Sequence, residues 1–326
     1  MHFLFNRVYY YAKWTLSSLP HLPCMIKNVR INRPVFLVGN QGSGLTLVSR
    51  ILRRVNNVVS VSGNSEYWSG PDEMQRVMVW RLPKELSLSG RFIQNEPPHP
   101  RLSSPRSWSY ASDDLVEHYH LTEKNYAKDS AEKFRSLISE VVCRHRADHQ
   151  EPRFLDKSQV FTLKIRYISA LLDGKNPHFA LITRNPYAAC YRAATGKAGD
   201  MERYTQFMDL EERVEVCSQH WTNSISYALR DGQEVEHFTW FRFEDILRRP
   251  EEKIKDLCRF LDLEFENDLL PAPHDKLPIG SKYRDRWYPL RPEVNQKYLK
   301  QAPSHLLDII ESRCKPVARE FGYERP

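Results

Sequence analysis

The chain has 326 residues, of which 41% are hydrophobic and 27% are charged. This composition can bury a large core, and it excludes a disordered chain, a collagen-like chain and a small disulfide-rich scaffold. Lysine and arginine total 48 against 41 acidic residues, which gives a net charge of +7. A modest basic excess suits an anionic ligand as well as a nucleic acid, so charge alone does not choose between them.

The six cysteines form no CxxC pair. This pattern predicts free or buried thiols in a reducing compartment and no bound metal. No run of about 18 uncharged apolar residues suggests a membrane span. The aromatic segment 1–19 is interrupted by charges and lacks the apolar core of a signal peptide. We therefore expect a cytoplasmic protein with an N-terminal extension over residues 1–33.

Strand and helix patterns alternate along the rest of the chain. In chain order, they predict a strand at 35–38, a helix at 45–55, a strand at 58–61, helices near 72–82, from 112 and at 130–146, a strand at 153–155, a helix at 161–172, a strand at 178–183, helices from 186 and at 211–230, a strand at 238–243, and helices at 250–261 and from about 304. This alternation is typical of an α/β fold with a mostly parallel sheet covered on both faces. We expect one domain over 34–326, with an irregular region at about 64–150 whose loops contact the acceptor.

A glycine-rich turn, Gly39 to Thr46, follows the first strand and opens the first helix with the spacing GxxxxGxT. In this context backbone N–H groups converge on an anion at a helix N-terminus. A loop that hydrolyses ATP or GTP places lysine just before the Ser/Thr, and here that position is Leu45. The turn is therefore predicted to bind an anion other than a nucleoside triphosphate with Mg²⁺.

The segment 37–47, LVGNQGSGLTL, resembles the first motif of sulfotransferases that use 3′-phosphoadenosine 5′-phosphosulfate (PAPS), in which hydrophobic-x-G-x-x-[RK]-S-G-T-[TS]-L is typical. The resemblance implies a three-layer P-loop-type fold without the Walker lysine, PAPS as donor, 3′-phosphoadenosine 5′-phosphate (PAP) as product, and no metal. It assigns the 5′-phosphosulfate to Gly42, Ser43, Gly44, Leu45 and Thr46. Gly42 stands where the family has a basic residue.

Two further segments resemble catalytic positions of this family. Glu66, after the second strand, stands where many members carry the base that takes the acceptor proton. His120 is the fallback for this role. Lys157, in the segment LDKSQ, resembles the lysine that stabilises charge on the leaving phosphate. Because Gly42 carries no charge, Lys157 is the best remaining cation for that task.

Three other segments resemble this family at its nucleotide site and in its architecture. The sequence Arg184-Asn185-Pro186 matches an R-[DN]-P motif whose arginine binds the 3′-phosphate of PAPS, and Arg192 stands where the family has a serine. Arg192 is interpreted either as a replacement for that contact or as an exposed side chain. The basic loop with Lys282, Tyr283 and Arg284 resembles a loop that closes over PAPS. The segment 241–261 resembles a strand and helix of the family's core.

The resemblance therefore implies transfer of a sulfuryl group from PAPS to a hydroxyl or amine of a small molecule, glycan or peptide. The aromatic residues Tyr67, Trp68, Trp108 and Tyr110 either stack on this acceptor or pack in the core. Two alternatives stay open: a P-loop nucleotide kinase, and a non-catalytic protein that binds PAP or nucleic acid. The basic loop at 280–287 would also suit a single-stranded nucleic acid, but closure over the nucleotide is favoured because the other family motifs precede it in the chain.

Overall fold

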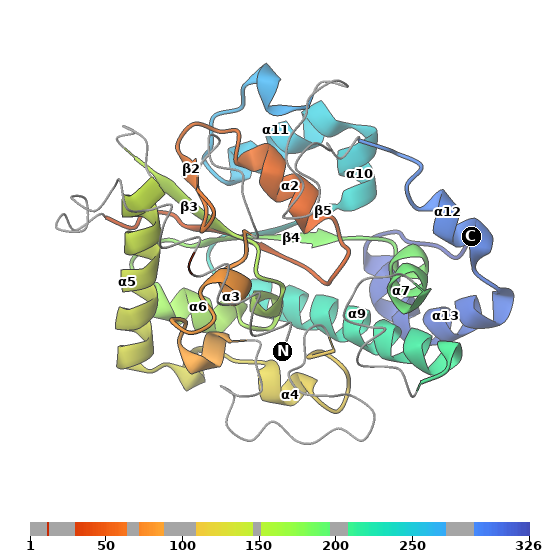
Figure 1. Cartoon of the computed structure of the whole chain (residues 1–326). Coiled ribbons are helices and arrows are strands. Elements are labelled where there is room, and N and C mark those ends of the chain that lie inside the picture. The colour runs from red at the N-terminus through yellow and green to blue at the C-terminus, as the bar shows by residue number, and fades with distance from the viewer. Residues whose placement is uncertain are drawn as a thin grey trace.

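The computed structural model describes Ala12 and residues 30–63, 72–87, 109–145, 151–195, 208–271 and 290–326. Figure 1 shows a central sheet with helices above and below it. The strands are β1 (Val35–Val38), β2 (Val58–Val59), β3 (Arg153–Asp156), β4 (His178–Thr183) and β5 (Phe238–Arg242). The α-helices are α2 (Leu45–Leu52), α3 (Met74–Val77), α4 (Val116–Tyr119), α5 (Lys128–His145), α6 (Ile165–Leu171), α7 (Pro186–Thr195), α9 (Leu210–Gly232), α10 (Phe243–Arg248), α11 (Pro250–Phe260), α12 (Gln296–Gln301) and α13 (Ser304–Glu320).

The five strands are all parallel and lie in the order β2-β3-β1-β4-β5. The predicted α/β fold with a parallel sheet is therefore confirmed. From β1 the chain continues toward β2 on one side of the sheet, whereas from β4 it continues to β5 on the other side. In open parallel sheets, ligands bind beyond the carboxyl ends of the strands where the chain direction diverges in this way. This rule places a binding site next to the end of β1.

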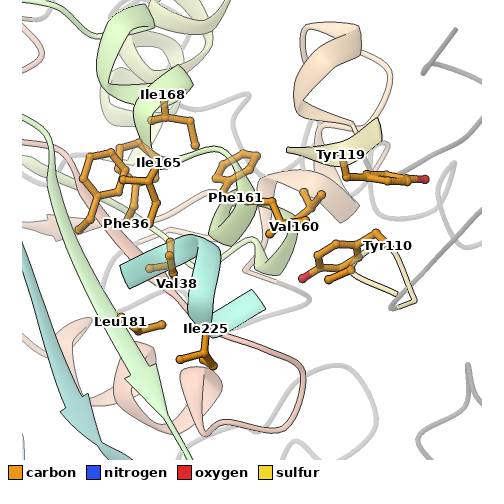
Figure 2. Packing of buried hydrophobic residues seen from close by; sticks show 14 of the residues in the cluster. Phe36, Val38, Tyr110, Tyr119, Val160, Phe161, Ile165, Ile168, Leu181 and Ile225 are labelled. Atoms are coloured by element: carbon orange, nitrogen blue, oxygen red, sulfur yellow. The ribbon is translucent and has the colours of Figure 1, made fainter. Parts of the chain in front are cut away.

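Alternate side chains of β1 enter two different hydrophobic layers, as the two-residue period of a strand requires. Val35 and Leu37 pack with α2, α10 and α11 on one face of the sheet. Phe36 and Val38 pack on the other face, which α5, α6, α9 and α13 cover. Figure 2 shows Phe36 in this second layer beside Ile165 and Phe161, and Phe36 also stacks on Phe179 with ring centroids 5.4 Å apart.

Polar residues start the helices that matter for the site. The side chain of Asn185 accepts hydrogen bonds from the N–H groups of Tyr187 and Ala188, and Pro186 occupies the first position of α7, where proline is tolerated. Asp209 and Glu212 form a capping box at the start of α9. Pro250 likewise opens α11. These starts are local in sequence, which is why the sequence predicted them closely.

The helix predicted over 161–172 is interrupted. A 3₁₀-helix covers Gln159–Leu163, and α6 begins only at Ile165. The break follows from long-range contacts: the Thr162 hydroxyl is tied to the backbone of Gly39, and the buried ammonium of Lys164 donates to the carbonyl of Glu85. These contacts fix non-helical geometry at Lys164. Both partners, Gly39 and Glu85, are distant in the sequence, so the apolar periodicity of 161–172 does not indicate the break.

The expectation of free thiols is confirmed for Cys190, Cys217, Cys258 and Cys314 and is wrong for Cys143, which is disulfide-bonded. Disulfides are rare in reducing compartments, so this bond argues against a cytoplasmic location. The cytoplasmic location stays a prediction. No helix in the described ranges is long and apolar enough to cross a membrane.

Candidate functional site

The candidate site begins at the loop that joins β1 to α2. The loop is held at its first residue, because the N–H of Gly39 donates to the hydroxyl of Thr162 (2.8 Å) and that hydroxyl donates back to the Gly39 carbonyl (3.1 Å). Its last residue, Gly44, is the N-cap of α2 and has a left-handed backbone with φ 99°. The loop therefore delivers the chain to the N-terminus of α2 at the carboxyl edge of the sheet.

Polar donors of this loop lack acceptors. Within the described part of the chain, the N–H groups of Gly42, Gly44, Leu45 and Thr46 have no hydrogen-bond partner, and no acidic residue lies in the first turn of α2. The hydroxyl of Ser43 is buried and also has no partner. Buried polar groups are normally satisfied, and a helix N-terminus attracts negative charge. An anion bound against the loop would satisfy these donors.

Gly44 is required by a close neighbour as well as by its backbone angle. A β-carbon at Gly44 would lie 2.3 Å from the ring of Phe243, the first residue of α10. Real β-carbons do not approach aromatic atoms so closely, so a side chain here would move the loop or the ring. Phe243 thus packs directly beneath the turn from the β5 side of the sheet.

Arg184 brings a buried positive charge to the same loop. It follows β4, is only 4% exposed, and donates from Nη1 to the carbonyl of Gly42 (2.8 Å). Its Nε donates to the amide oxygen of Asn295 (2.8 Å), and its guanidinium lies over the ring of Phe243 (5.6 Å to the centroid) and over that of Tyr298 (6.0 Å). Its Nη2 is buried without a partner. One donor edge of Arg184 is therefore available to a ligand.

A carboxylate behind Arg184 organises the residues around it. Glu244 accepts hydrogen bonds from the backbone of Asn185, from the Asn295 amide and from the Tyr323 hydroxyl. The pKa of Arg184 is lowered to about 10, first by burial and then by the nearby charge of Arg192, while the charge of Glu244 opposes the shift. The guanidinium stays charged at neutral pH. Glu244 accepts hydrogen bonds from these three donors and forms no ion pair with Arg184. It therefore positions the residues around Arg184.

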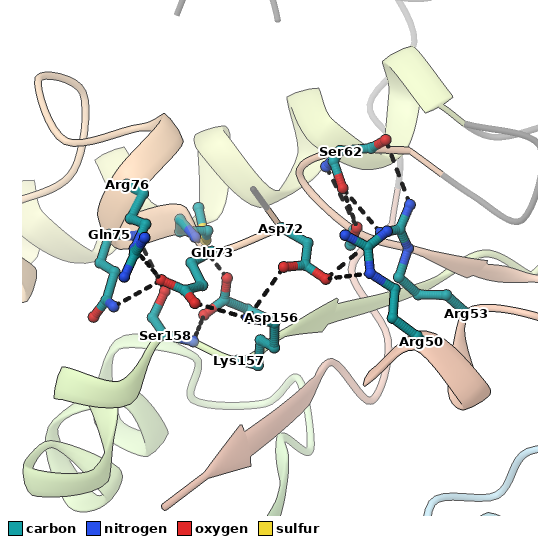
Figure 3. Close-up of polar contacts among 12 residues, drawn as sticks. Arg50, Arg53, Ser62, Asp72, Glu73, Gln75, Arg76, Asp156, Lys157 and Ser158 are labelled. Atoms are coloured by element: carbon teal, nitrogen blue, oxygen red, sulfur yellow. Dashed lines mark hydrogen bonds and ion pairs between the residues drawn. The ribbon is translucent and has the colours of Figure 1, made fainter. Parts of the chain in front are cut away.

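The predicted catalytic residue Lys157 belongs to a buried ion-pair cluster, which we define as Arg50, Arg53, Asp72, Glu73 and Lys157. Its Nζ lies 3.1 Å from Asp72 and 2.7 Å from Glu73. Figure 3 shows both carboxylates turned toward Lys157, with the two arginines on the other side of Asp72. The side chain of Lys157 is only 3% exposed. Its ammonium is therefore shared between two carboxylates.

Burial opposes the charges of this cluster, and their pairing outweighs burial. Burial lowers the pKa of Lys157, but Asp72 and Glu73 raise it above its ordinary value. Burial also raises the pKa of Asp72, while Lys157, Arg50 and Arg53 together bring it well below its usual range. Lys157 is thus charged, and its ammonium is held in ion pairs with Asp72 and Glu73. Its proposed contact with a leaving phosphate stays a prediction.

Asp156 connects this cluster to the end of β3. Its carboxylate accepts hydrogen bonds from the N–H groups of Met74 (2.8 Å) and Ser158 (2.7 Å). Burial raises the pKa of Asp156 to about 6, although these hydrogen bonds lower it. Asp156 therefore fixes the segment that carries Asp72 and Glu73 against the strand that carries Lys157.

Of the other predicted site residues, several lie outside the described part of the chain, His120 lies away from the loop, and Tyr110 lies in the core. Glu66, Lys282, Tyr283 and Arg284 lie outside the described residues, as do Tyr67, Trp68 and Trp108. His120 pairs with the buried Asp231 (2.9 Å) at the C-terminal end of α9. That point is about 15 Å along the helix from Trp221, whose indole donates to the carbonyl of Arg184.

Tyr110 is fully buried against Tyr119 and His220 in the core. Tyr110 therefore packs in the core of this structure, and a contact with the acceptor stays a prediction. Among the described residues, no group of three or more acidic, histidine or cysteine side chains could hold a metal.

Sequence reasoning missed the residues that support Arg184. Asn295 and Tyr298 on and before α12 carry no motif, and they reach Arg184 from more than a hundred positions away. Phe243 and Glu244 were interpreted as architecture only, yet they contact Gly44 and the Arg184–Asn185 segment. The only available signal was their place at the end of the last strand, where a parallel sheet presents its site.

The fold and this loop define a class: an α/β protein of the P-loop-like type, with a glycine-rich loop after the first strand of a parallel sheet. Residues 34–267 match the model of the sulfotransferase family, which spans more than half of the chain. The chain belongs to the sulfotransferase family. No curated protein sequence matches it.

Solved structures share the fold at low sequence identity. The sulfotransferase domain from the curacin biosynthetic pathway is 16% identical, with a TM-score of 0.54 over 91% of this chain and 100% of that one. The sulfotransferase domain of the Synechococcus PCC 7002 olefin synthase is 19% identical, with a TM-score of 0.53 over 92% and 99%. Sulfotransferase STF9 from Mycobacterium avium is 12% identical, with a TM-score of 0.50 over 94% and 81%. These similarities concern the fold alone.

Proposed function

We propose that the chain transfers a sulfuryl group from PAPS to a hydroxyl or amine acceptor. The observation that carries this proposal is the set of unsatisfied donors at the β1–α2 loop. Buried Ser43 Oγ, buried Arg184 Nη2 and the loop amides all lack acceptors in the described structure. A family member that binds a donor with phosphate groups accounts for such a set, because each donor gains an acceptor on binding.

The loop and Arg184 have separate roles in this proposal. Amides from Gly42 to Thr46 hold the 5′-phosphosulfate at the N-terminus of α2. The free edge of Arg184 binds the 3′-phosphate, for which a planar guanidinium is well suited. The basic residues Lys282 and Arg284, with Tyr283, are proposed to cover the nucleotide. Asn295 and Tyr298, which follow this segment in the chain, contact Arg184 directly.

Bound PAPS supplies the sulfuryl group: the acceptor oxygen or nitrogen forms a bond to sulfur while the bond from sulfur to the 5′-phosphate oxygen breaks and its electron pair leaves on PAP. Glu66 is proposed to take the proton that the acceptor loses. Two neighbours of its segment support this placement. Ser62 accepts from Arg53, and Asp72 pairs with Arg53 and Lys157, so both ends of the segment meet at the ion-pair cluster.

The proposal is tested with ³⁵S-labelled PAPS and a panel of glycans, lipids, peptides and small metabolites as acceptors. We expect a labelled product from the wild-type protein. Glu66→Gln should lower turnover by about 10²- to 10⁴-fold, the usual contribution of a general base, with PAP affinity nearly unchanged. The matched control is Glu264→Gln, an exposed carboxylate, which should leave both quantities unchanged. Turnover that survives Glu66→Gln would contradict the assigned base.

The two alternatives predict different results in the same assay. A nucleotide kinase would turn over ATP with Mg²⁺, but Leu45 in the lysine position is buried in the core and offers no charge to a triphosphate. A non-catalytic binder would hold PAP tightly and release no labelled product with any acceptor. The acceptor panel identifies the acceptor and its hydroxyl or amine chemistry, and the cytoplasmic location stays a prediction.

A further inference from the structure

Arg192, on α7, lies next to Gly42, the loop position at which the family has a basic residue. Gly42 has a left-handed backbone with φ 84°, and a β-carbon built there would lie 2.7 Å from Nη1 of Arg192. The guanidinium from α7 therefore occupies the space into which a side chain at position 42 would project. Glycine at 42 and arginine at 192 fit each other: a larger residue at 42 would displace the guanidinium.

Arg192 brings a second positive charge beside Arg184. The two guanidinium groups are close enough for Arg192 to lower the pKa of Arg184. Within the described ranges, Arg192 has no hydrogen-bond or ion-pair partner. Like charges placed together in a partly buried site are unfavourable unless an anion lies between them. Nη2 of Arg184 and Oγ of Ser43 also lack a hydrogen-bond acceptor in the described structure.

We propose that Arg192 replaces the loop cation missing at Gly42 and binds the 5′-phosphosulfate end of the donor, while Arg184 serves the 3′-phosphate. This inference rests on the proposed function. It differs from the interpretation of Arg192 as a substitute for the 3′-phosphate serine, because the guanidinium meets the loop itself. Charge accumulates on the 5′-phosphate as its bond to sulfur breaks, so a fixed guanidinium there lowers the barrier as well as the dissociation constant.

The test compares three nucleotides by isothermal titration: PAP, adenosine 5′-monophosphate and adenosine 3′-monophosphate. We expect Arg192→Ala to weaken PAP and the 5′-monophosphate by about 10- to 150-fold, the range for a hydrogen bond to a charged group. The 3′-monophosphate should change less than about 3-fold, within the scatter of such values. Arg184→Ala should show the reverse preference. The control Arg259→Ala removes an exposed arginine on α11 and should change no affinity.

A second variant tests the geometry independently of charge removal. Gly42→Ala should displace Arg192 and weaken the 5′-monophosphate in the wild-type background, but should add little in the Arg192→Ala background. This non-additivity would report direct coupling of the two positions, whereas the backbone strain at 42 is the same in both backgrounds. Thermal unfolding without nucleotide checks that each variant is folded.

The outcomes separate this inference from the proposed function. If the wild type binds PAP and Arg192→Ala weakens only PAP and the 3′-monophosphate, Arg192 serves the other phosphate and the inference is wrong. Unchanged affinity for all three nucleotides would also overturn it and leave the proposed function intact. A wild-type protein that binds none of the nucleotides would overturn both.

Discussion

Two groups of buried or partly buried charges lie at the carboxyl edge of the sheet, and they differ in whether the cations have partners. In the ion-pair cluster, Arg50, Arg53 and Lys157 each lie within 4 Å of a carboxylate of Asp72 or Glu73. At the β1–α2 loop, Arg184 and Arg192 have no ion pair among the described residues, and donors of Ser43 and Arg184 stay unsatisfied. Unpaired buried charges next to a fully paired cluster point to a functional site at the β1–α2 loop, as proposed above.

The largest expected effect concerns the paired group. Lys157→Met should lower the free energy of unfolding by about 3–5 kcal/mol, because it leaves Asp72 and Glu73 buried without their shared ammonium. Urea denaturation measures this loss. The stabilisation of the folded variant by PAP should persist, since ligand binding adds to stability independently of the cluster. Unchanged stability together with lost turnover would break the comparison and assign Lys157 to catalysis.

A smaller effect appears in the pH dependence of stability. The raised pKa of Asp156, about 6 against an ordinary 3.8, means that the folded state holds a proton that the unfolded state has released between these values. Stability from this group is therefore full below pH 3.8 and falls by about 3 kcal/mol as pH rises through 6. Asp156→Asn should remove this contribution.

The difference between wild type and Asp156→Asn, measured by urea denaturation from pH 3.5 to 7, isolates the group from the other carboxylates. A difference that stays constant with pH would show that Asp156 titrates normally. It would also mean that burial at the end of β3 is less complete than the geometry indicates.

The smallest effect concerns a cation that shares Glu73 with Lys157. Arg76 lies 2.7 Å from Glu73, but half of its side chain is exposed to solvent. Arg76→Ala should therefore change the free energy of unfolding by only about 0–1 kcal/mol, the range for exposed ion pairs. A loss as large as that of Lys157→Met would show that the number of partners of Glu73, and not their burial, sets the stability of the cluster.

The sequence predicted best those features whose causes are local. The strand His178–Thr183 was predicted with its observed bounds, because a buried apolar run ends at the polar Arg184-Asn185 pair and Pro186. The glycine-rich turn and the start of α7 were equally readable from neighbouring residues. Here spacing and turn chemistry suffice.

Contacts between distant segments could not be predicted in the same way. The carboxylates that neutralise Lys157 lie more than 80 positions earlier in the chain, at the start of the short helix predicted near 72–82. Arg192 was weighed between two roles because its sequence neighbours do not reveal that it meets Gly42. Pairing of buried charges depends on the tertiary fold, and a single sequence without its fold does not report it.

The last thirty or so residues carry a practical consequence for anyone who trims this chain. The family match ends at residue 267, yet Asn295, Tyr298 and Tyr323 hold Arg184 and Glu244 in place. A fragment cut at the family boundary would retain all five strands and lose the amide, the aromatic cover and the phenol that orient the guanidinium. The same cut would remove α13, which covers one hydrophobic layer of the sheet, so the fragment would lose core packing as well as the residues that orient Arg184. Expression boundaries should therefore extend to the C-terminal helix and the tail behind it.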